Sequence, residues 1–190
     1  MNQTSHPRAK PRDLPAVRQA ILQVTAMLLL SACAMAVAPV ASSEPATREP
    51  GPLVVLTAGR FNIEDPSEGP TGGGVEYRWA PLDRWKLVPG MGFTLADGGV
   101  AYGYGTLRYD FRLGNSWFLT PVFGAGLFSN GGDVDLGHAV QFKTGIELSA
   151  RVADRYRVGL LFYHLSNAGL SDDNPGVEVL EVVFGIPAGR

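Results

Sequence analysis

The sequence predicts an all-β fold, an eight-stranded antiparallel up-and-down transmembrane β-barrel that follows an N-terminal export segment. Three observations predict it. Short apolar or alternating runs recur between turn-rich clusters along residues 53–187. Charged residues make up only 18% of the chain, below the roughly 25% of ordinary soluble proteins. Glycine is abundant, with 24 residues, and glycines relieve crowding where a sheet curves tightly.

Residues 1–42 are typical of a secretory signal peptide. They are polar and mostly basic up to position 19, and residues 20–41 carry no charge. Two alternatives stay open. The segment Leu30-Ser31-Ala32-Cys33 resembles a bacterial lipobox, in which Cys33 would carry a lipid. The same apolar run is also long enough to span a bilayer uncleaved. The sequence does not fix a cleavage site.

The remainder divides into a linker and one domain. Residues 43–52 are rich in proline, serine and charge, which predicts a short disordered linker. Residues 53–190 form the predicted barrel. The chain has one cysteine, Cys33, so the mature protein has no internal disulfide and no thiolate metal site. A formal net charge of -2 implies no general attraction to nucleic acid.

Eight strands are expected between the turn clusters. Their predicted ranges are 53–63, 73–81, 85–96, 99–113, 116–129, 138–152, 156–167 and 177–187. Several run to about 10–15 residues, which is long for a soluble sheet but suits a tilted membrane strand. Separators such as Asn130-Gly131-Gly132-Asp133 favour tight turns.

Alternation along two strands predicts one apolar face and one charged face. The apolar positions are Leu107, Tyr109, Phe111 and Leu113 on one strand, and Phe142, Ile146 and Leu148 on the other. In a closed membrane barrel the apolar face meets lipid, and the charged face fills a narrow lumen where charges must pair. The residues expected to supply those pairs are Glu76, Arg78, Arg108, Asp110, Arg112, Lys143 and Glu147.

Five aromatic residues fall near predicted strand ends or along the outward face: Tyr77, Trp79, Trp85, Tyr109 and Trp117. Aromatic girdles at the membrane interfaces would place them there. Ordinary packing within the strands explains any single one of them equally well.

Strand parity brings three chemically active residues onto one face. His164 and Ser166 are two positions apart, so their side chains point the same way. If the last two strands pair with His164 opposite Glu178, the same register sets Phe162 against Leu180, Leu160 against Val182, and Val158 against Phe184. Since each of these pairs is apolar, the shared face is predicted to meet lipid.

The roles of the three residues follow from their chemistry. Ser166 would attack an acyl carbonyl, His164 would accept its proton, and Glu178 would orient the imidazole and stabilise its charged form. Backbone N–H groups of residues 167–176, with Asn167 or Asn174, could stabilise the oxyanion. A nucleophile at a lipid-facing rim suits an ester of a membrane lipid. Taken singly, each residue also fits a structural or solvated role.

Other polar residues of the predicted loops carry less information. His138, Asp97, Asp133 and Asp135 have no partner at a useful spacing and are interpreted as solvated. Asp172 and Asp173 fit a cation near lipid phosphates, or simple turn chemistry.

These motifs resemble a known family. The segment His164-Leu165-Ser166-Asn167-Ala168-Gly169, with Asn174-Pro175-Gly176 and Glu178, resembles the active-site segment of PagL-type lipid A 3-O-deacylases. Those proteins are eight-stranded integral barrels of the Gram-negative outer membrane. The resemblance is specific over residues 156–187 and rests on strand number and size over 53–155. One departure is the C-terminus, because the last aromatic residue is Phe184 rather than the terminal residue.

The resemblance implies a reaction and a set of roles. Ser166 would be the nucleophile, His164 the base and Glu178 the third member of a triad. The residues that would form or support the oxyanion site are Asn167, Ala168, Gly169 and Asn174. The reaction would hydrolyse the ester-linked 3-hydroxyacyl chain at position 3 of lipid A, without metal or cofactor. The partner would be lipid A or lipopolysaccharide in the outer leaflet, and homodimer formation stays open.

Three other functions remain compatible with the residues. A non-catalytic structural or adhesion barrel would leave lipid masses unchanged. A lipid acyltransferase would add mass to its acceptor instead of removing it. A soluble lipocalin-like barrel would be extracted without detergent.

Overall fold

The computed structural model describes residues 51–64, 69–131, 134–153 and 155–189. The predicted signal peptide and all but the last two residues of the predicted linker lie outside this described part. No helix within it is long and apolar enough to cross a membrane.

The described residues form a barrel of antiparallel strands. The strands are β1 Leu53–Phe61, β2 Thr71–Arg78, β3 Leu87–Ala96, β4 Val100–Tyr109, β5 Phe111–Leu113, β6 Trp117–Ser129, β7 Val140–Val152, β8 Tyr156–Ser166 and β9 Val177–Pro187. Both β4 and β5 pair with β6, on either side of Asp110, so they are two parts of one interrupted strand. The predicted eight-stranded barrel is therefore confirmed, with strand ends within three residues of those expected.

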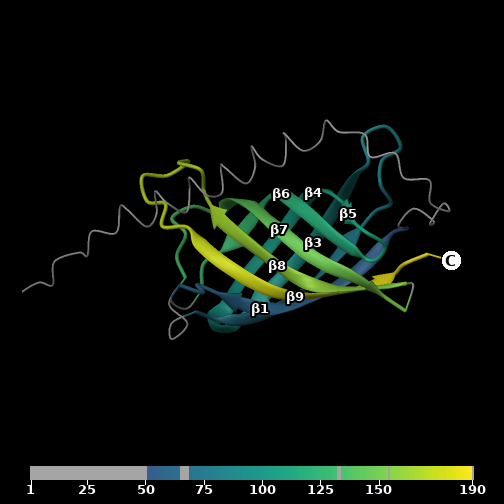
Figure 1. The fold of residues 1–190 in the computed structure, drawn as a ribbon. Helices are drawn as coiled ribbons and strands as arrows, with labels where there is room; N and C mark the ends of the chain where they lie inside the picture. The colour runs from purple at the N-terminus through teal and green to yellow at the C-terminus, as the bar shows by residue number, and fades with distance from the viewer. Residues whose placement is uncertain (1–50, 65–68, 132–133, 154, 190) are drawn as a thin grey trace, which may run out of the picture. The chain divides into compact units, whose positions relative to one another are not determined.

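The sheet closes on itself. Neighbouring strands pair in the order β4-β3-β2-β1-β9-β8-β7-β6-β5, and the pairing of β4 with β6 joins the two ends (Figure 1). Closure matters in a membrane because every backbone N–H and C=O at a free strand edge would lack a partner in the lipid.

The two ends of the barrel differ in their connections. The connections at one end, named the outer end below, are residues 62–70, 97–99, 130–139 and 167–176. The opposite, inner end holds the start of β1, the end of β9 and the connections 79–86, 114–116 and 153–155. The long β8–β9 connection and the C-terminal end of β9 lie at opposite ends of the barrel in Figure 1. Outer-membrane barrels carry their longer loops on the outside of the cell, which is the basis for these names.

A network of ion pairs fills the lumen near the inner end. Arg108 Nη2 lies 2.7 Å from Glu76 Oε2, and Arg78 Nη2 lies 2.8 Å from Glu147 Oε2. All four side chains are almost completely buried. Because these residues come from β2, β4 and β7, their pairing ties together strands that are not neighbours in the sheet.

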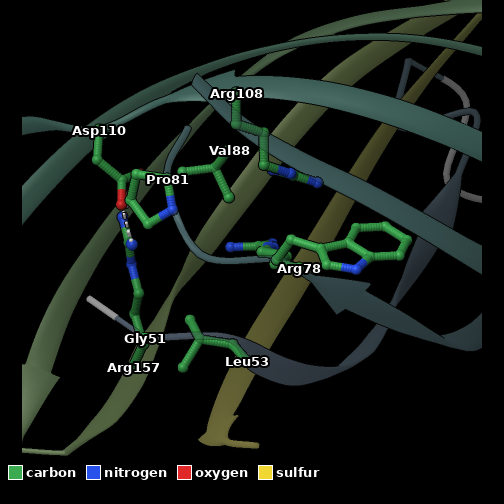
Figure 2. A pocket seen from close by; sticks show the side chains of 9 residues that line it. Gly51, Leu53, Arg78, Pro81, Val88, Arg108, Asp110 and Arg157 are labelled. Carbon is green, nitrogen blue, oxygen red and sulfur yellow. Dashed lines mark hydrogen bonds and ion pairs between the residues drawn. The ribbon is translucent and has the colours of Figure 1, made fainter. Parts of the chain in front are cut away.

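Arg157 of β8 extends the same network. Its guanidinium lies 2.6 Å from Asp110 Oδ2 and also reaches Glu147. Figure 2 shows Arg157 and Asp110 joined, with Arg78 and Arg108 pointing into the same pocket. The sequence analysis named Asp110 as a source of ion pairs but did not foresee Arg157.

Lys143 and Arg112, which were expected among the paired charges, lie outside this buried network. The Nζ of Lys143 lies over the rings of Tyr104 and Tyr163, 4.2 and 3.8 Å from their centroids. This buried ammonium is stabilised by ring faces, in a cation–π arrangement, instead of by direct contact with a carboxylate. Arg112 follows the interruption at Asp110 and is exposed at the inner end.

The outward face is apolar, and its tryptophans and tyrosines gather at the inner end. The five aromatic residues singled out in the sequence analysis all lie there, and the ring of Tyr77 meets Trp79 edge to face. The remaining tyrosines are Tyr156, also at the inner end, and the lumen residues Tyr102, Tyr104 and Tyr163. Among the residues that the structure describes, tyrosine and tryptophan therefore form a girdle at the inner end and none at the outer end.

The lumen network leads to a prediction about stability. Replacing Glu147 by Gln removes the carboxylate shared by Arg78, Arg108 and Arg157. Breaking one partner of a buried network leaves uncompensated charge, so the free energy of unfolding should fall by about 3–5 kcal/mol. Denaturant titration of the barrel in detergent, followed by tryptophan fluorescence, measures it.

The matched control is Asp83→Asn, which neutralises an exposed carboxylate in the 79–86 connection. It should change the free energy of unfolding by less than about 0.5 kcal/mol. Equal effects of the two substitutions would contradict the structural part assigned to Glu147.

Candidate active site

The register of β8 and β9 places the candidate residues at the outer end. His164 pairs with Glu178, and the apolar pairs below them are Phe162 with Leu180, Leu160 with Val182, and Val158 with Phe184. This is the register predicted from parity, and it is confirmed. The apolar residues of this stripe are exposed on the barrel surface, so the face is the lipid-facing one.

His164 and Glu178 are joined by a hydrogen bond. The imidazole Nδ1 lies 3.0 Å from Glu178 Oε1, and the two side chains are 34% and 15% exposed. An ionised carboxylate can only accept, so Nδ1 donates in this bond, and in the neutral imidazole Nε2 then carries the lone pair. An imidazole in this tautomer can act as a base through Nε2.

Gly176 packs against the other side of the imidazole. Its φ of 67° lies in the left-handed region, and a Cβ added there would come within 2.6 Å of His164 Cε1 and 3.0 Å of Nε2. The register pairs Leu165 with Val177, so the next position, Ser166, lies beside Gly176. The loop backbone therefore holds the ring from the side of Ser166.

Ser166 is half-buried on the same outward face as His164. The two residues are separated by one pleat of β8, about 7 Å between Cα atoms. The described hydrogen bonds join His164 to Glu178 and not to Ser166. A serine–imidazole bond that tightens only when substrate binds is common in hydrolases.

Asn167 is buried and fixes the loop that follows Ser166. Its Nδ2 donates to the carbonyl oxygens of Leu136, at 3.1 Å, and Asp173, at 2.8 Å. Its Oδ1 accepts from the N–H of Gly169 at 2.9 Å. The bond to Leu136 therefore joins the 130–139 and 167–176 connections, and the other two hold the 167–176 connection in shape. Neither this side chain nor the N–H of Gly169 is an open donor toward the Ser166 hydroxyl.

Two donors of the 167–176 connection belong to residues that the sequence analysis named. Asn174 accepts from the N–H of Asn167 through Oδ1, at 3.0 Å, which leaves its amide nitrogen for another acceptor. Ala168 is exposed, with a φ of 53°, and its N–H makes none of the hydrogen bonds described for this part of the chain. Both groups lie within the loop that Asn167 anchors.

The 130–139 connection supports the site from behind. The carbonyl of Leu136 accepts from Asn167, and Gly137, with a φ of 72°, lies directly against the Asp173 carbonyl. Sequence reasoning missed these contacts because nothing in the spacing links residues about 30 positions apart. Among the described residues, no group of three or more His, Cys, Asp or Glu side chains could hold a metal ion.

Comparisons with known proteins agree on one family. The model of the family described as "Lipid A 3-O-deacylase (PagL)" matches residues 71–187. The "Lipid A deacylase PagL" of Bordetella bronchiseptica is 29% identical over 115 residues, which cover 56% of this chain and 63% of that protein. The match thus spans less than two thirds of that relative. The "Crystal structure of the outer membrane enzyme PagL" has a TM-score of 0.57 at 24% identity, covering 71% of this chain and 99% of that one, and shows the same fold.

The packing of Gly176 against His164 gives a prediction that needs no assay of activity. Gly176→Ala should displace the imidazole and disrupt its hydrogen bond to Glu178, since the new Cβ would meet the ring. The Nδ1–H signal of His164, read by NMR of protein with ¹⁵N-labelled histidine, should lose its protection from exchange with solvent.

Gly169→Ala is the matched control. Gly169 also has a positive φ, of 81°, but a Cβ added there meets nothing within 4 Å. The His164 signal should survive in this variant. If both variants lose the signal, or neither does, Gly176 does not hold the ring.

Proposed function

The chain belongs to the lipid A 3-O-deacylase (PagL) family, and from this premise we propose that it is a serine esterase of the outer membrane. It hydrolyses the ester-linked 3-hydroxyacyl chain at position 3 of lipid A. Ser166 is the nucleophile, His164 the general base and Glu178 the group that orients the base. The observation that carries this proposal is the 3.0 Å bond between His164 and Glu178 on the outward face that also holds Ser166.

The proposed reaction has two halves. The Ser166 hydroxyl attacks the ester carbonyl while His164 Nε2 takes its proton, and collapse of the tetrahedral intermediate releases the sugar hydroxyl, which receives that proton. Water then attacks the acyl-enzyme, again with His164 as base, and releases a 3-hydroxy fatty acid and free Ser166. Glu178 stabilises the imidazolium through Nδ1 in both halves.

The oxyanion is assigned to two donors of the 167–176 connection. These are the N–H of Ala168 and the amide nitrogen of Asn174. Asn167 and Gly169 have a supporting part, because their hydrogen bond and the contacts of Asn167 with Leu136 and Asp173 hold the loop in shape. Donors held in place before the reaction stabilise developing charge without reorganising.

The surroundings of the site favour a lipid over a soluble ester. Below His164 and Glu178, the exposed side chains of β8 and β9 are apolar, and an acyl chain can lie along them. The outer end, with its longer connections, faces the outside of the cell and therefore the outer leaflet. Residues 1–42 supply the export step that this location requires.

The proposed chemistry uses groups of one chain. Nucleophile, base and charge stabilisation all come from side chains of β8, β9 and their connection, so no step needs a metal, a cofactor or a second copy of the protein.

The central substitution is Ser166→Ala. Purified lipid A incubated with the wild-type protein should lose the mass of one hydroxyacyl chain. The variant should lower this rate about 10³-fold or more while the barrel stays folded. Mass spectrometry of the lipid measures the reaction.

Ser129→Ala provides the comparison, since Ser129 is exposed at the outer end of β6 and lies outside the proposed site. It should react like the wild type. An unchanged rate in Ser166→Ala would refute the assignment, and a gain of lipid mass would identify an acyltransferase.

A further inference from the structure

Arg60 stands out on the lipid-facing surface. Along β1 the inward positions Val55, Thr57 and Phe61 are buried, whereas Leu56 and Ala58 are exposed, so Arg60 shares the outward face. Among the strand residues that the structure describes, only three outward positions hold Asp, Glu, Lys, Arg or His. They are Arg60, His164 and Glu178.

Arg60 lies next to the proposed active site. It pairs with Leu180 of β9, and Glu178 is the next outward position of β9 toward the outer end. Strand spacing sets Arg60 about 10 Å from β8 across the sheet and about 7 Å below the level of His164. A long arginine stem covers much of that distance when it directs its charge toward the headgroups.

The cost of a charge on this face depends on depth. An outward arginine destabilises a barrel by about 2–4 kcal/mol at the middle of the bilayer but by only about 0–1 kcal/mol near its interfaces. Arg60 is the second-last residue of β1, at the outer end. Its backbone lies at the register of Leu180, so its guanidinium meets a headgroup phosphate by extending along the surface toward the outer end.

The described connections at the outer end are acidic, which sets the positively charged Arg60 apart from them. The described residues of the outer connections include Glu64, Asp97, Asp135, Asp172 and Asp173, and no lysine or arginine. Lys143 also lies toward the outer end, but it is completely buried in the lumen. Within the described part of the chain, Arg60 is thus the arginine or lysine that lies on the outward face at this end.

We propose that Arg60 binds a phosphate group of the lipid whose acyl ester reaches Ser166. This inference rests on the function proposed above. Guanidinium groups bind phosphate with two parallel hydrogen bonds, which fix orientation as well as position. With the phosphate held at β1, the sugar lies across β9 and the ester faces β8. Arg60 is then a substrate-binding residue that sets which ester of a multiply acylated lipid is cleaved.

The test compares two substrates that differ only in their phosphate groups. One is lipid A, and the other is the same lipid A after removal of its phosphates by a phosphatase, both in a maltoside detergent that carries no phosphate. The wild type should have a higher kcat/KM for the phosphorylated lipid, by about 10–100-fold, as one charge-assisted contact predicts.

Three variants are compared by the ratio of kcat/KM for phosphorylated lipid A to kcat/KM for dephosphorylated lipid A. Arg60→Ala should bring the ratio close to one, and Arg60→Lys should keep part of it because the charge remains. Arg84→Ala removes one exposed positive charge at the inner end and should keep the wild-type ratio. If Arg60→Ala lowers both values equally, the residue acts through Glu178 or the fold, and the proposal is wrong.

A binding experiment tests this proposal separately from the function on which it rests. The probe is phosphorylated or dephosphorylated lipid A added to the Ser166→Ala barrel, with and without Arg60→Ala. Arg60→Ala should weaken binding of the phosphorylated lipid alone, about 10-fold or more. An undiminished affinity for the phosphorylated lipid would overturn the proposed phosphate contact even if the enzyme is active.

Competition by phosphatidylglycerol as strong as that by lipid A would show that Arg60 binds bulk membrane phosphates, and this result would also overturn the proposal. Failure of the wild type to release acyl chains from either lipid would refute the proposed function separately.

Discussion

Glu147 makes the contacts on which the arrangement of the barrel depends. Its carboxylate meets Arg78 of β2, Arg108 of β4 and Arg157 of β8, so one buried group links strands around the whole lumen. Charges buried this deeply are tolerated only when they pair, and they pair only if these residues all point inward. Inward charges fix the opposite parity for the lipid face. The outward direction of His164, Ser166 and Glu178 is therefore a consequence of a lumen that they do not touch.

At the outer end, too, polar groups must pair with one another. Polar groups on a lipid-facing surface are costly unless they satisfy one another, and the bond between His164 and Glu178 does so. Asn167 begins the loop after Ser166 with a buried amide that holds three backbone groups, so the loop keeps its shape without a core of its own. The proposed chemistry would thus rely on β8 and β9 to hold His164, Ser166 and Glu178, and on one buried amide to hold the loop beside them.

Strand parity made much of this structure predictable from the sequence. The pairing of His164 with Glu178 could be derived because every neighbouring pair in that register is apolar. The partners of the lumen charges could not be derived, since Arg78 and Glu147 are 69 positions apart and meet only through closure. Arg157 was overlooked because its strand looks almost entirely apolar. The part played by Asn167 depends on the 130–139 connection, whose course no local pattern reveals. Arg60 was within reach of the same parity argument applied to β1.

The central claim is that Ser166 is a nucleophile activated by the pair His164–Glu178. Reaction with a serine-directed lipid phosphonate, followed by mass spectrometry of the digested protein, tests it most directly. The adduct should form on Ser166, and Glu178→Gln should slow its formation about 100-fold or more, because the imidazolium loses its charged partner. An adduct on another residue, or equal rates for the wild type and Glu178→Gln, would contradict the account.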